Sequence, residues 1–204
     1  MKRFWPLCLV FIAACGGDPQ AQPAPPAASA GQSVATAVFA SGCFWCTESD
    51  FDKIAGVVAT VSGYTGGNFA NPTYEQVSSG GTGHVEAVQV TYDPAIVSYE
   101  QLLDAYWPTV DPFNDRGQFC DVGEQYRPVI FVASPEEREA AEVSKRRAEE
   151  RLGRSVVVAV EPAATFYPAE TYHQDYYTKN PARYNFYRWS CGRDARLEEV
   201  WGAH

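Results

Sequence analysis

Residues 35–56 read ATAVFASGCFWCTESDFDKIAG, and this stretch decides the fold class. The first six residues form a short apolar run before a Ser-Gly pair, which is typical of a buried strand. Phe44 and Phe51 then follow at helical spacing, and Gly56 is expected to end the helix. Cys43 is therefore predicted to lie at a strand-to-helix junction, in the first turn of the helix.

Outward from this stretch, strands and helices follow in mixed order. Capping-box chemistry predicts a helix from Ser98, and Ser134-Pro135 begins a long charged helix that stops at Gly153. Further strands are expected at 57–64, 84–92, 126–132 and 155–160. The order predicts an α+β fold: a two-layer α/β sandwich with a mixed sheet and a ferredoxin-like core. An irregular, aromatic-rich C-terminal tail is expected from residue 162, with only a short helix at 197–201.

The 204-residue chain divides into three parts. Lys2 and Arg3 precede nine apolar residues, too few to span a bilayer but enough for a secretory signal. Residues 1–15 are therefore interpreted as a signal peptide, and residues 16–33, rich in Pro, Ala and Gly, as a linker. Residues 34–204 form the expected domain, which we expect to be monomeric.

The signal segment ends Ala13-Ala14-Cys15, which resembles the lipobox of bacterial lipoproteins. Cys15 would then carry the lipid, and the alternative is an ordinary signal cleaved after Ala14. We expect an exported, lipid-anchored protein of the cell envelope. Because Gly16 rather than Asp follows Cys15, the sequence favours the periplasmic face of the outer membrane if the cell is Gram-negative.

The formal net charge of −9 argues against nucleic-acid binding, which depends on Lys and Arg contacts to phosphates. Small molecules and peptides stay open as substrates. The sequence thus favours a domain with a chemical site over a nucleic-acid-binding module.

Four cysteines remain in the domain, namely Cys43, Cys46, Cys120 and Cys191. Two structural disulfides are the ordinary interpretation in an exported protein, although a domain of this size does not need them. Cys43 is the more specific candidate. Free backbone N–H groups and the dipole at a helix N-terminus are expected to lower its pKa and favour a thiolate nucleophile.

Glu86 is the second candidate. In the strand expected at 84–92, a period of two places Glu86 on the face of Val88, Val90 and Tyr92. Burial there would raise its pKa and make it a general acid at neutral pH. The alternative, that Glu86 reaches water at the end of its strand, stays open. A thiolate and a neutral acid together suit attack on a sulfoxide, whose oxygen must be protonated as it leaves.

Six blocks of sequence follow one another along the domain. They are Gly42-Cys43-Phe44-Trp45, Gly63-Tyr64-Thr65-Gly66-Gly67, Asn71-Pro72-Thr73-Tyr74, Gly83-His84-Val85-Glu86-Ala87-Val88, Asp121 with Gln125-Tyr126-Arg127, and His173-Gln174-Asp175-Tyr176-Tyr177 with Lys179-Asn180-Pro181. In this order they resemble the A-type peptide methionine sulfoxide reductases, and the match covers residues 36–181.

The resemblance implies a role for each matched residue. It makes Cys43 the nucleophile and Glu86 the acid. Reduction of the S epimer of methionine sulfoxide, free or in proteins, would pass through a cysteine sulfenic acid and an intramolecular disulfide. No bound cofactor or metal is expected, and a thioredoxin-type reductant would supply electrons. The substrate-binding residues would be Phe44 and Trp45 around the methyl group, Tyr74 and Tyr126 at the sulfoxide oxygen, and Asp121 beside them.

The resolving cysteine is where the chain departs from the family pattern. The glycine-rich, cysteine-bearing tail of many members is absent. Because the family often resolves from its C-terminal tail, Cys191 is the first choice, and Cys46, one helical turn from Cys43, is the second. Cys120 adjoins Asp121 and is either near the site or an inert packed thiol.

Two other functions fit parts of the sequence. Cys43-Phe44-Trp45-Cys46 has the spacing of a thioredoxin-like oxidoreductase, although the order of the later elements does not suggest that fold. A zinc-binding or disulfide-stapled module would instead use the four cysteines, with His84 or His173 as a further ligand.

Overall fold

The computed structural model describes residues 33–202. The expected signal peptide, the lipid attachment at Cys15 and nearly all of the linker lie outside these residues. Within the described part, no helix is long and apolar enough to cross a membrane.

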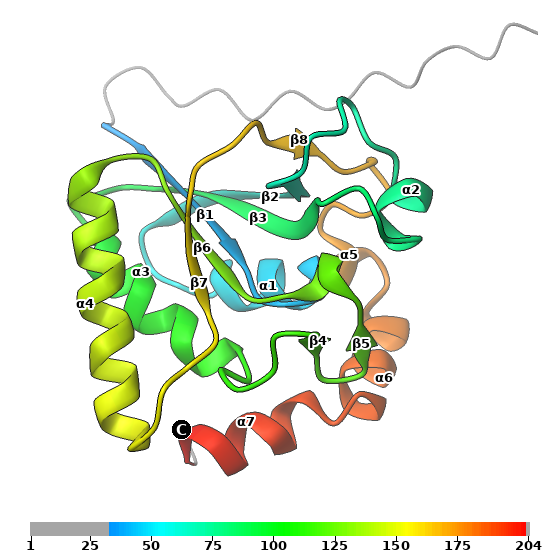
Figure 1. Ribbon diagram of the computed structural model, residues 1–204. Coiled ribbons are helices and arrows are strands. Elements are labelled where there is room, and N and C mark those ends of the chain that lie inside the picture. Colours follow the sequence, from blue (N-terminus) through cyan, green and yellow to red (C-terminus); the bar gives the residue numbers. More distant parts are fainter. Residues whose placement is uncertain (1–32, 203–204) are drawn as a thin grey trace, which may run out of the picture.

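A six-stranded sheet in the order β7-β6-β1-β3-β2-β8 forms the centre of the domain (Figure 1). All neighbours are antiparallel except β6 and β7, so the predicted mixed sheet is confirmed. A separate two-stranded sheet joins β4 and β5. The strands are β1 Ala35–Ala40, β2 Val57–Thr65, β3 Val85–Tyr92, β4 Gly117–Gln118, β5 Asp121–Val122, β6 Val129–Val132, β7 Ala159–Pro162 and β8 Tyr167–Pro168.

Seven α-helices and two 3₁₀ turns accompany the strands in the described part. The capping box of Ser98 with Gln101 and the Ser134 cap of the long charged helix are both present, as the sequence predicts. The helices are α1 Phe44–Phe51, α2 Tyr74–Ser78, α3 Tyr99–Tyr106, α4 Pro135–Leu152, α5 Tyr176–Lys179, α6 Pro181–Ser190 and α7 Arg193–Trp201, and the 3₁₀ turns are η1 Trp107–Thr109 and η2 Glu124–Tyr126.

The main core lies between one face of the sheet and the helices. Phe39 of β1 and Val88 and Val90 of β3 pack there with side chains from α1, α3, α4 and α7. A smaller cluster, with Ala87 and Phe131, covers the other face. The core is aliphatic and aromatic, and the only methionine in the sequence is Met1. The two-layer α+β prediction is therefore confirmed.

Helix α1 is shorter than the sequence predicts. It ends at Phe51 with Asp52 as its C-cap, and not at Gly56. Two short-range hydrogen bonds, from Ile54 N to Phe51 O and from Val57 N to Ile54 O, form a turn instead. Gly56 has φ +98° and leads this turn into β2, so its positive φ serves the strand start rather than the helix end.

Two strands begin later than expected. β6 starts at Val129, because Tyr126 belongs to a 3₁₀ turn and Pro128 has no N–H to donate to a ladder. β7 starts at Ala159, since the N–H of Val157 pairs instead with the carbonyl of Pro112 in a loop.

The expectation of an irregular C-terminal tail up to residue 197 was wrong. The chain is largely irregular only to about residue 175, and then forms α5, α6 and α7 in succession. Aromatic residues are middling helix formers, so the composition of this segment gives no strong helical signal. Packing against α1 holds these helices: Tyr176 stacks on Trp45 at 3.8 Å, and Tyr184 packs in one cluster with Cys46.

Candidate active site

Cys43 occupies the N-cap of α1, directly after β1. Its side chain is buried, at 5% exposure. Gly42, the preceding residue, has φ +89°, and a Cβ there would lie 2.6 Å from Cβ of Gln118. Glycine is therefore required at this turn, which delivers Cys43 to the helix end under the cover of Gln118.

Glu86 lies against the same helix end. Its Oε2 accepts a hydrogen bond of 3.0 Å from the backbone N–H of Phe44, and its side chain is only 3% exposed. Burial raises the pKa of Glu86 to about 8, although the Phe44 hydrogen bond opposes this. The buried reading of Glu86 is thus confirmed, and the group is protonated at neutral pH.

The two free thiols form a pair. A hydrogen bond joins Cys43 to Cys46, one turn along α1. Burial, and then the Cys46 sulfur, raise the pKa of Cys43 well above its usual value. The Cys43 hydrogen bond, with the charges of Arg193 and Arg188, lowers the pKa of Cys46 to about 7. The pair therefore readily holds one negative charge, which rests on Cys46.

The expectation that the helix end lowers the pKa of Cys43 was wrong. The first free N–H of α1, that of Phe44, is taken by Glu86 and is not available to the sulfur. Complete burial then outweighs the remaining effect of the helix dipole. Cys43 therefore rests as a thiol, and Cys46 beside it is the thiol that loses its proton first.

Aromatic rings enclose the site. Trp45 stacks on Tyr176, and its indole N–H donates to Nδ1 of His173 at 3.0 Å. The His173 ring lies 5.0 Å from that of Phe44 and 4.4 Å from that of Tyr74. Burial lowers the pKa of His173 to about 4, so its ring is neutral and adds no charge. The site is an aromatic box around a thiol and a neutral acid.

Two tyrosines and an aspartate complete the site. Burial, with the charges of Glu86 and Cys43, raises the pKa of Tyr74 to about 12, and the pKa of Tyr126 is also raised by burial and by Glu86. Burial raises the pKa of Asp121, which also raises the pKa values of both tyrosines. All three side chains lie within electrostatic reach of one another, and both hydroxyls stay protonated as hydrogen-bond donors.

Tyr187 of α6 connects Asp121 to the nucleophile. Its hydroxyl donates a short hydrogen bond to Asp121 Oδ2 and also hydrogen-bonds the Cys43 sulfur. The Sγ atom of Cys120 lies 3.9 Å from the other carboxylate oxygen of Asp121. A chain of contacts thus runs from Cys43 through Tyr187 and Asp121 to Cys120.

Cys120 and Cys191 form a disulfide with a Cα–Cα distance of 4.9 Å. It ties the turn between β4 and β5 to the junction of α6 and α7. Cys120 is exposed and Cys191 is partly exposed, whereas Cys43 and Cys46 are buried. Cys191 therefore has another partner than Cys43 in this structure.

The structure gathers most of the expected site residues in one place. They are Cys43, Phe44, Trp45, Cys46, Tyr74, Glu86, Asp121 and Tyr126. The Cys43–Cys191 bridge is not present and stays a prediction. Roles for Tyr187 and His173 were missed, although His173 stands in one of the six matched blocks. Tyr187 had no sequence signal, because its contact with Asp121 spans 66 positions.

The zinc-site alternative finds little support in the described residues. One group there, Cys120, Asp121 and Cys191, offers three ligand atoms within 4.8 Å of one another. Two of these atoms are the sulfurs of the disulfide, and a metal ligand must be a free thiolate.

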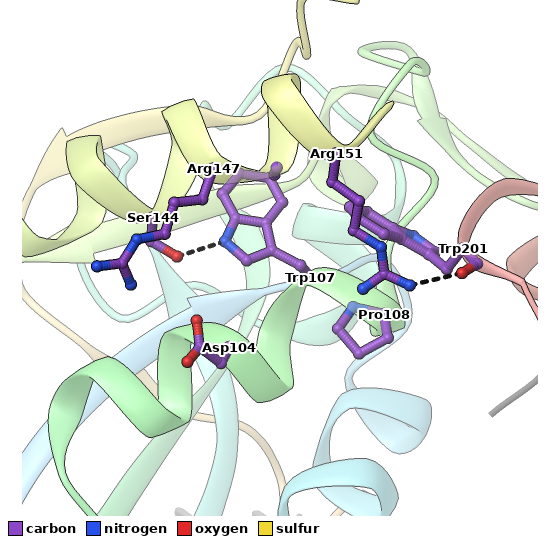
Figure 2. Close-up of a pocket in the computed structure, with 8 residues that line it drawn as sticks. Asp104, Trp107, Pro108, Ser144, Arg147, Arg151 and Trp201 are labelled. Atoms are coloured by element: carbon purple, nitrogen blue, oxygen red, sulfur yellow. Dashed lines mark hydrogen bonds between the residues drawn. The ribbon is translucent and has the colours of Figure 1, made fainter. Parts of the chain in front are cut away.

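A separate pocket of about 360 Å³ lies between α3, η1 and α4 (Figure 2). Arg147 and Arg151 stand beside the indoles of Trp107 and Trp201, and Asp104 faces them from α3. No cysteine or histidine lines it, so it lacks both a nucleophile and a proton-transfer group of the kind found around Cys43.

A buried nucleophilic thiol, a second thiol beside it and a protonated carboxyl group define a thiol-dependent oxidoreductase. Comparisons with known proteins specify the class. A family profile described as "Peptide methionine sulfoxide reductase" matches residues 35–204. "Peptide methionine sulfoxide reductase MsrA 2" of Caulobacter vibrioides is 48% identical over 203 residues, which cover 99% of this chain and all of that protein.

Two further relatives agree. "Peptide methionine sulfoxide reductase MsrA/MsrB" of Vibrio cholerae is 53% identical over 82% of this chain, which spans 45% of that longer protein. The reduced form of Mxr1 from Saccharomyces cerevisiae has a similar fold, with a TM-score of 0.70 and 30% identity over 75% of this chain and 88% of that one. The chain belongs to the peptide methionine sulfoxide reductase family, in its A branch. It is a thiol-dependent methionine sulfoxide reductase.

Proposed function

We propose that this enzyme acts on the S epimer of methionine sulfoxide, free or within oxidised proteins. One observation carries the proposal: a carboxyl group with a pKa of about 8, Glu86, lies against the helix turn that holds the Cys43 thiol. A sulfoxide oxygen leaves poorly as an anion, and a neutral acid beside the nucleophile supplies the proton it needs.

The chemical step can be written in balanced form. The Cys43 sulfur attacks the sulfoxide sulfur as its proton passes along the shared hydrogen bond to Cys46. Glu86 gives its proton to the sulfoxide oxygen. The hydroxyl group then moves from the substrate sulfur to the Cys43 sulfur as the S–O bond and the transient bond between the two sulfurs break, and methionine leaves. Cys43 becomes a sulfenic acid, oxidised by two electrons, while the substrate sulfur is reduced by two electrons.

Aromatic and hydroxyl groups would fix the substrate. Phe44 and Trp45 would enclose the methyl group, while the Tyr74 and Tyr126 hydroxyls donate to the sulfoxide oxygen. Both hydroxyls stay protonated, which suits donation. Asp121 holds Tyr187 against the site. A chiral sulfur that must place its methyl group, oxygen and lone pair in fixed positions explains selection of one epimer.

The geometry favours Cys46 over Cys191 as the first partner of Cys43. Cys46 is hydrogen-bonded to Cys43, whereas Cys191 is joined to Cys120. Attack of the Cys46 sulfur on the Cys43 sulfenic acid forms a disulfide and releases water. No bound cofactor takes part, and a dithiol reductant of the thioredoxin type restores the thiols.

Reduction of the separate epimers of a methionine sulfoxide peptide, with dithiothreitol as the reductant, tests this proposal. We expect rapid loss of the S epimer and little loss of the R epimer, because each reductase class serves one epimer. Equal rates on the two epimers would refute the assignment.

We further propose that the enzyme repairs oxidised proteins in the cell envelope, attached by a lipid on Cys15. The support is the sequence alone: a short apolar segment that ends Ala13-Ala14-Cys15. Metabolic labelling with a radioactive fatty acid tests this. The parent protein should carry label and the Cys15→Ala variant should not, so label retained in the variant would contradict the proposed site.

A further inference from the structure

Arg193, the first residue of α7, carries a permanent positive charge in the interior of the protein, where its side chain is 1% exposed. A charge is costly to bury, so a buried arginine depends on the groups that surround it. We infer that Arg193 is a positioning residue of the reaction, whose guanidinium holds the turn before Cys43 and sets a positive charge near Cys46. This inference deepens the proposed function and rests on it, since it takes Cys43 and Cys46 as the reacting thiols.

The guanidinium of Arg193 joins segments that are far apart in the sequence. Its Nη1 donates to the carbonyl of Ser41 at 3.2 Å, and its Nη2 donates to the carbonyl of Thr109 at 2.6 Å. The Phe119 ring, in the turn between β4 and β5, covers the guanidinium at 4.5 Å from its centre. Because Ser41 stands two residues before Cys43, α7 and the turn η1 together fix the chain just ahead of the nucleophile.

A chain of buried hydroxyl groups extends this contact to Cys43 itself. Thr47 donates its hydroxyl proton to the Cys43 carbonyl at 3.2 Å, so Ser41 must be the donor in the 2.6 Å hydrogen bond between the two hydroxyls. The Ser41 oxygen in turn accepts from Nη2 of Arg193 at 3.5 Å. A hydroxyl group has one proton to give, which fixes the direction of the chain from the guanidinium to the backbone of Cys43.

Arg193 also supplies positive charge near the second thiol. The Cys43 hydrogen bond has the largest effect on the pKa of Cys46 and lowers it, while burial opposes this. The charge of Arg193 comes next and lowers that pKa further, followed by the charge of Arg188, and Asp50 acts in the opposite direction. Two arginines from the C-terminal helices thus favour a thiolate on Cys46.

The two arginines differ in how far carboxylates neutralise them. The guanidinium nitrogens of Arg188 lie 2.9 Å from an Asp50 oxygen and 2.8 Å from an Asp194 oxygen. Among the described residues, the one carboxylate within 4.0 Å of the Arg193 guanidinium is that of Asp50, at 3.8 Å. Arg193 is therefore the less neutralised of the two positive charges.

The other titratable groups that act on Cys46 are uncharged at neutral pH. They are Glu86 of β3 and Tyr184 of α6, whose pKa values are raised by burial. In the proposed step a Cys46 thiolate accepts the Cys43 proton, so the fraction of Cys46 that is ionised sets how often the pair is ready to react. The charge of Arg193 raises this fraction.

The role of the charge is tested by titrating Cys46 in the full chain without substrate. The ultraviolet absorbance of thiolate, measured as the difference between an enzyme and its Cys46→Ser counterpart, reports on this thiol. Arg193→Met keeps the bulk of the side chain and removes its charge. The midpoint, at about 7 in the parent, should move to higher pH, and the ionised fraction at pH 7 should fall roughly fivefold for a shift of about one unit.

A merely structural role for Arg193 would lower the free energy of unfolding and leave this midpoint where it is, and that result would overturn the inference about the charge. If the Arg193→Met chain does not fold, Arg193→Gln removes the same charge and keeps an N–H donor for one carbonyl. The expected shift and the contradicting result are the same for that variant.

The role of the hydrogen bonds is tested with Arg193→Lys. An ammonium group keeps the charge but lacks the planar fork that reaches the Ser41 and Thr109 carbonyls together. Cys46 should titrate nearly as in the parent, while single-turnover reduction of the S epimer should slow at least about tenfold, because small displacements of a reacting group are costly. A normal rate would overturn the positioning role, and a midpoint shifted as far as in Arg193→Met would overturn the role of the charge.

Arg196→Met is the matched control, because Arg196 lies on the same helix and pairs with Asp111 at 2.8 Å. It should change neither the Cys46 midpoint nor the rate, and equal effects of the two arginines would overturn a specific role for Arg193. The titration uses no substrate, which separates this inference from the proposed function. Failure of the parent to reduce the S epimer with dithiothreitol would refute the proposed function, whereas identical titrations of the parent and Arg193→Met would refute only the inference about Arg193.

Discussion

The two cysteine pairs of this protein lie in opposite surroundings. Cys43 and Cys46 are separated by two residues on one helix, buried among aromatic rings, and reduced. Cys120 and Cys191 are separated by 71 positions, lie at the surface, and form a disulfide. Burial gives the first pair a dry site in which a carboxyl group keeps its proton. Cys120 is exposed and Cys191 partly exposed, so the comparison separates a buried site of reaction from a disulfide at the surface.

The strongest way to break the comparison is to remove one cysteine from each pair. Cys43→Ser should lower the rate of sulfoxide reduction by roughly 10⁴–10⁶-fold, because the nucleophile itself is lost. Cys191→Ser should still form one methionine per enzyme in a single-turnover assay with excess enzyme. An equal loss in both variants would mean that Cys191 takes part in the chemical step, and that the two cysteine pairs do not have separate roles.

Glu86→Gln tests whether the buried carboxyl group supplies the proton. Glutamine keeps the size but holds no transferable proton, so the rate should fall roughly 10²–10⁴-fold. In the parent enzyme the rate should also fall as pH rises through about 8, where Glu86 loses its proton at the pKa that burial gives it. The pH dependence of kcat/KM measures both effects.

Glu48→Gln is the matched control. Glu48 is also buried on the inner side of α1, and burial likewise raises its pKa to about 8. This variant should reduce sulfoxide at the rate of the parent enzyme and should still lose activity above pH 8. If instead it abolished the alkaline loss while Glu86→Gln kept it, the acid would have been assigned to the wrong carboxyl group.

The exposed pair should contribute more to stability than to the chemical step. The disulfide closes a loop of 71 residues, and its loss should lower the free energy of unfolding by about 2–4 kcal/mol. A Cys120→Ser/Cys191→Ser double variant, unfolded by urea, measures this against the oxidised parent. Addition of dithiothreitol should destabilise the parent and leave the variant unchanged. If dithiothreitol destabilised the variant equally, the loss of stability would not come from reduction of this disulfide.

The smallest expected effect concerns the link between the pairs. Tyr187→Phe removes the hydroxyl that contacts both Asp121 and Cys43, and the rate should fall roughly 10–160-fold, the scale of one hydrogen bond to a charged group. Tyr177→Phe removes a comparable hydrogen bond, to Asp52 at 2.9 Å, and is the control. Equal effects of the two changes would argue against a specific role for Tyr187.

Local sequence signals correctly predicted the burial of Glu86 on the sheet and the starts of two helices. The period of two along β3 placed Glu86 on the buried face, and the capping residues Ser98 and Ser134 marked two helix starts correctly. These signals work because each depends on residues within a few positions. The pKa of Cys43 was predicted in the wrong direction, because tertiary burial, and then the Cys46 sulfur, raise it. Glu86, 42 positions away from Phe44, also occupies the first N–H of the helix.

The other half of the site depends on contacts that no local pattern encodes. The Cys120–Cys191 disulfide joins the turn between β4 and β5 to the junction of α6 and α7. No residue near either cysteine in the sequence predicts which cysteine it pairs with. The helices of the tail form because Tyr176 and Tyr184 pack on α1, while their own residues favour helix only weakly. Tertiary packing decided both features.

The core described above contains no methionine, and the one methionine of the chain is Met1. Valine, leucine and aromatic side chains fill the places that a flexible thioether often takes. Oxidants that turn methionine into its polar sulfoxide therefore find no methionine to modify between the sheet and its helices. The domain from residue 34 onward therefore contains no residue that could become a substrate of its own reaction.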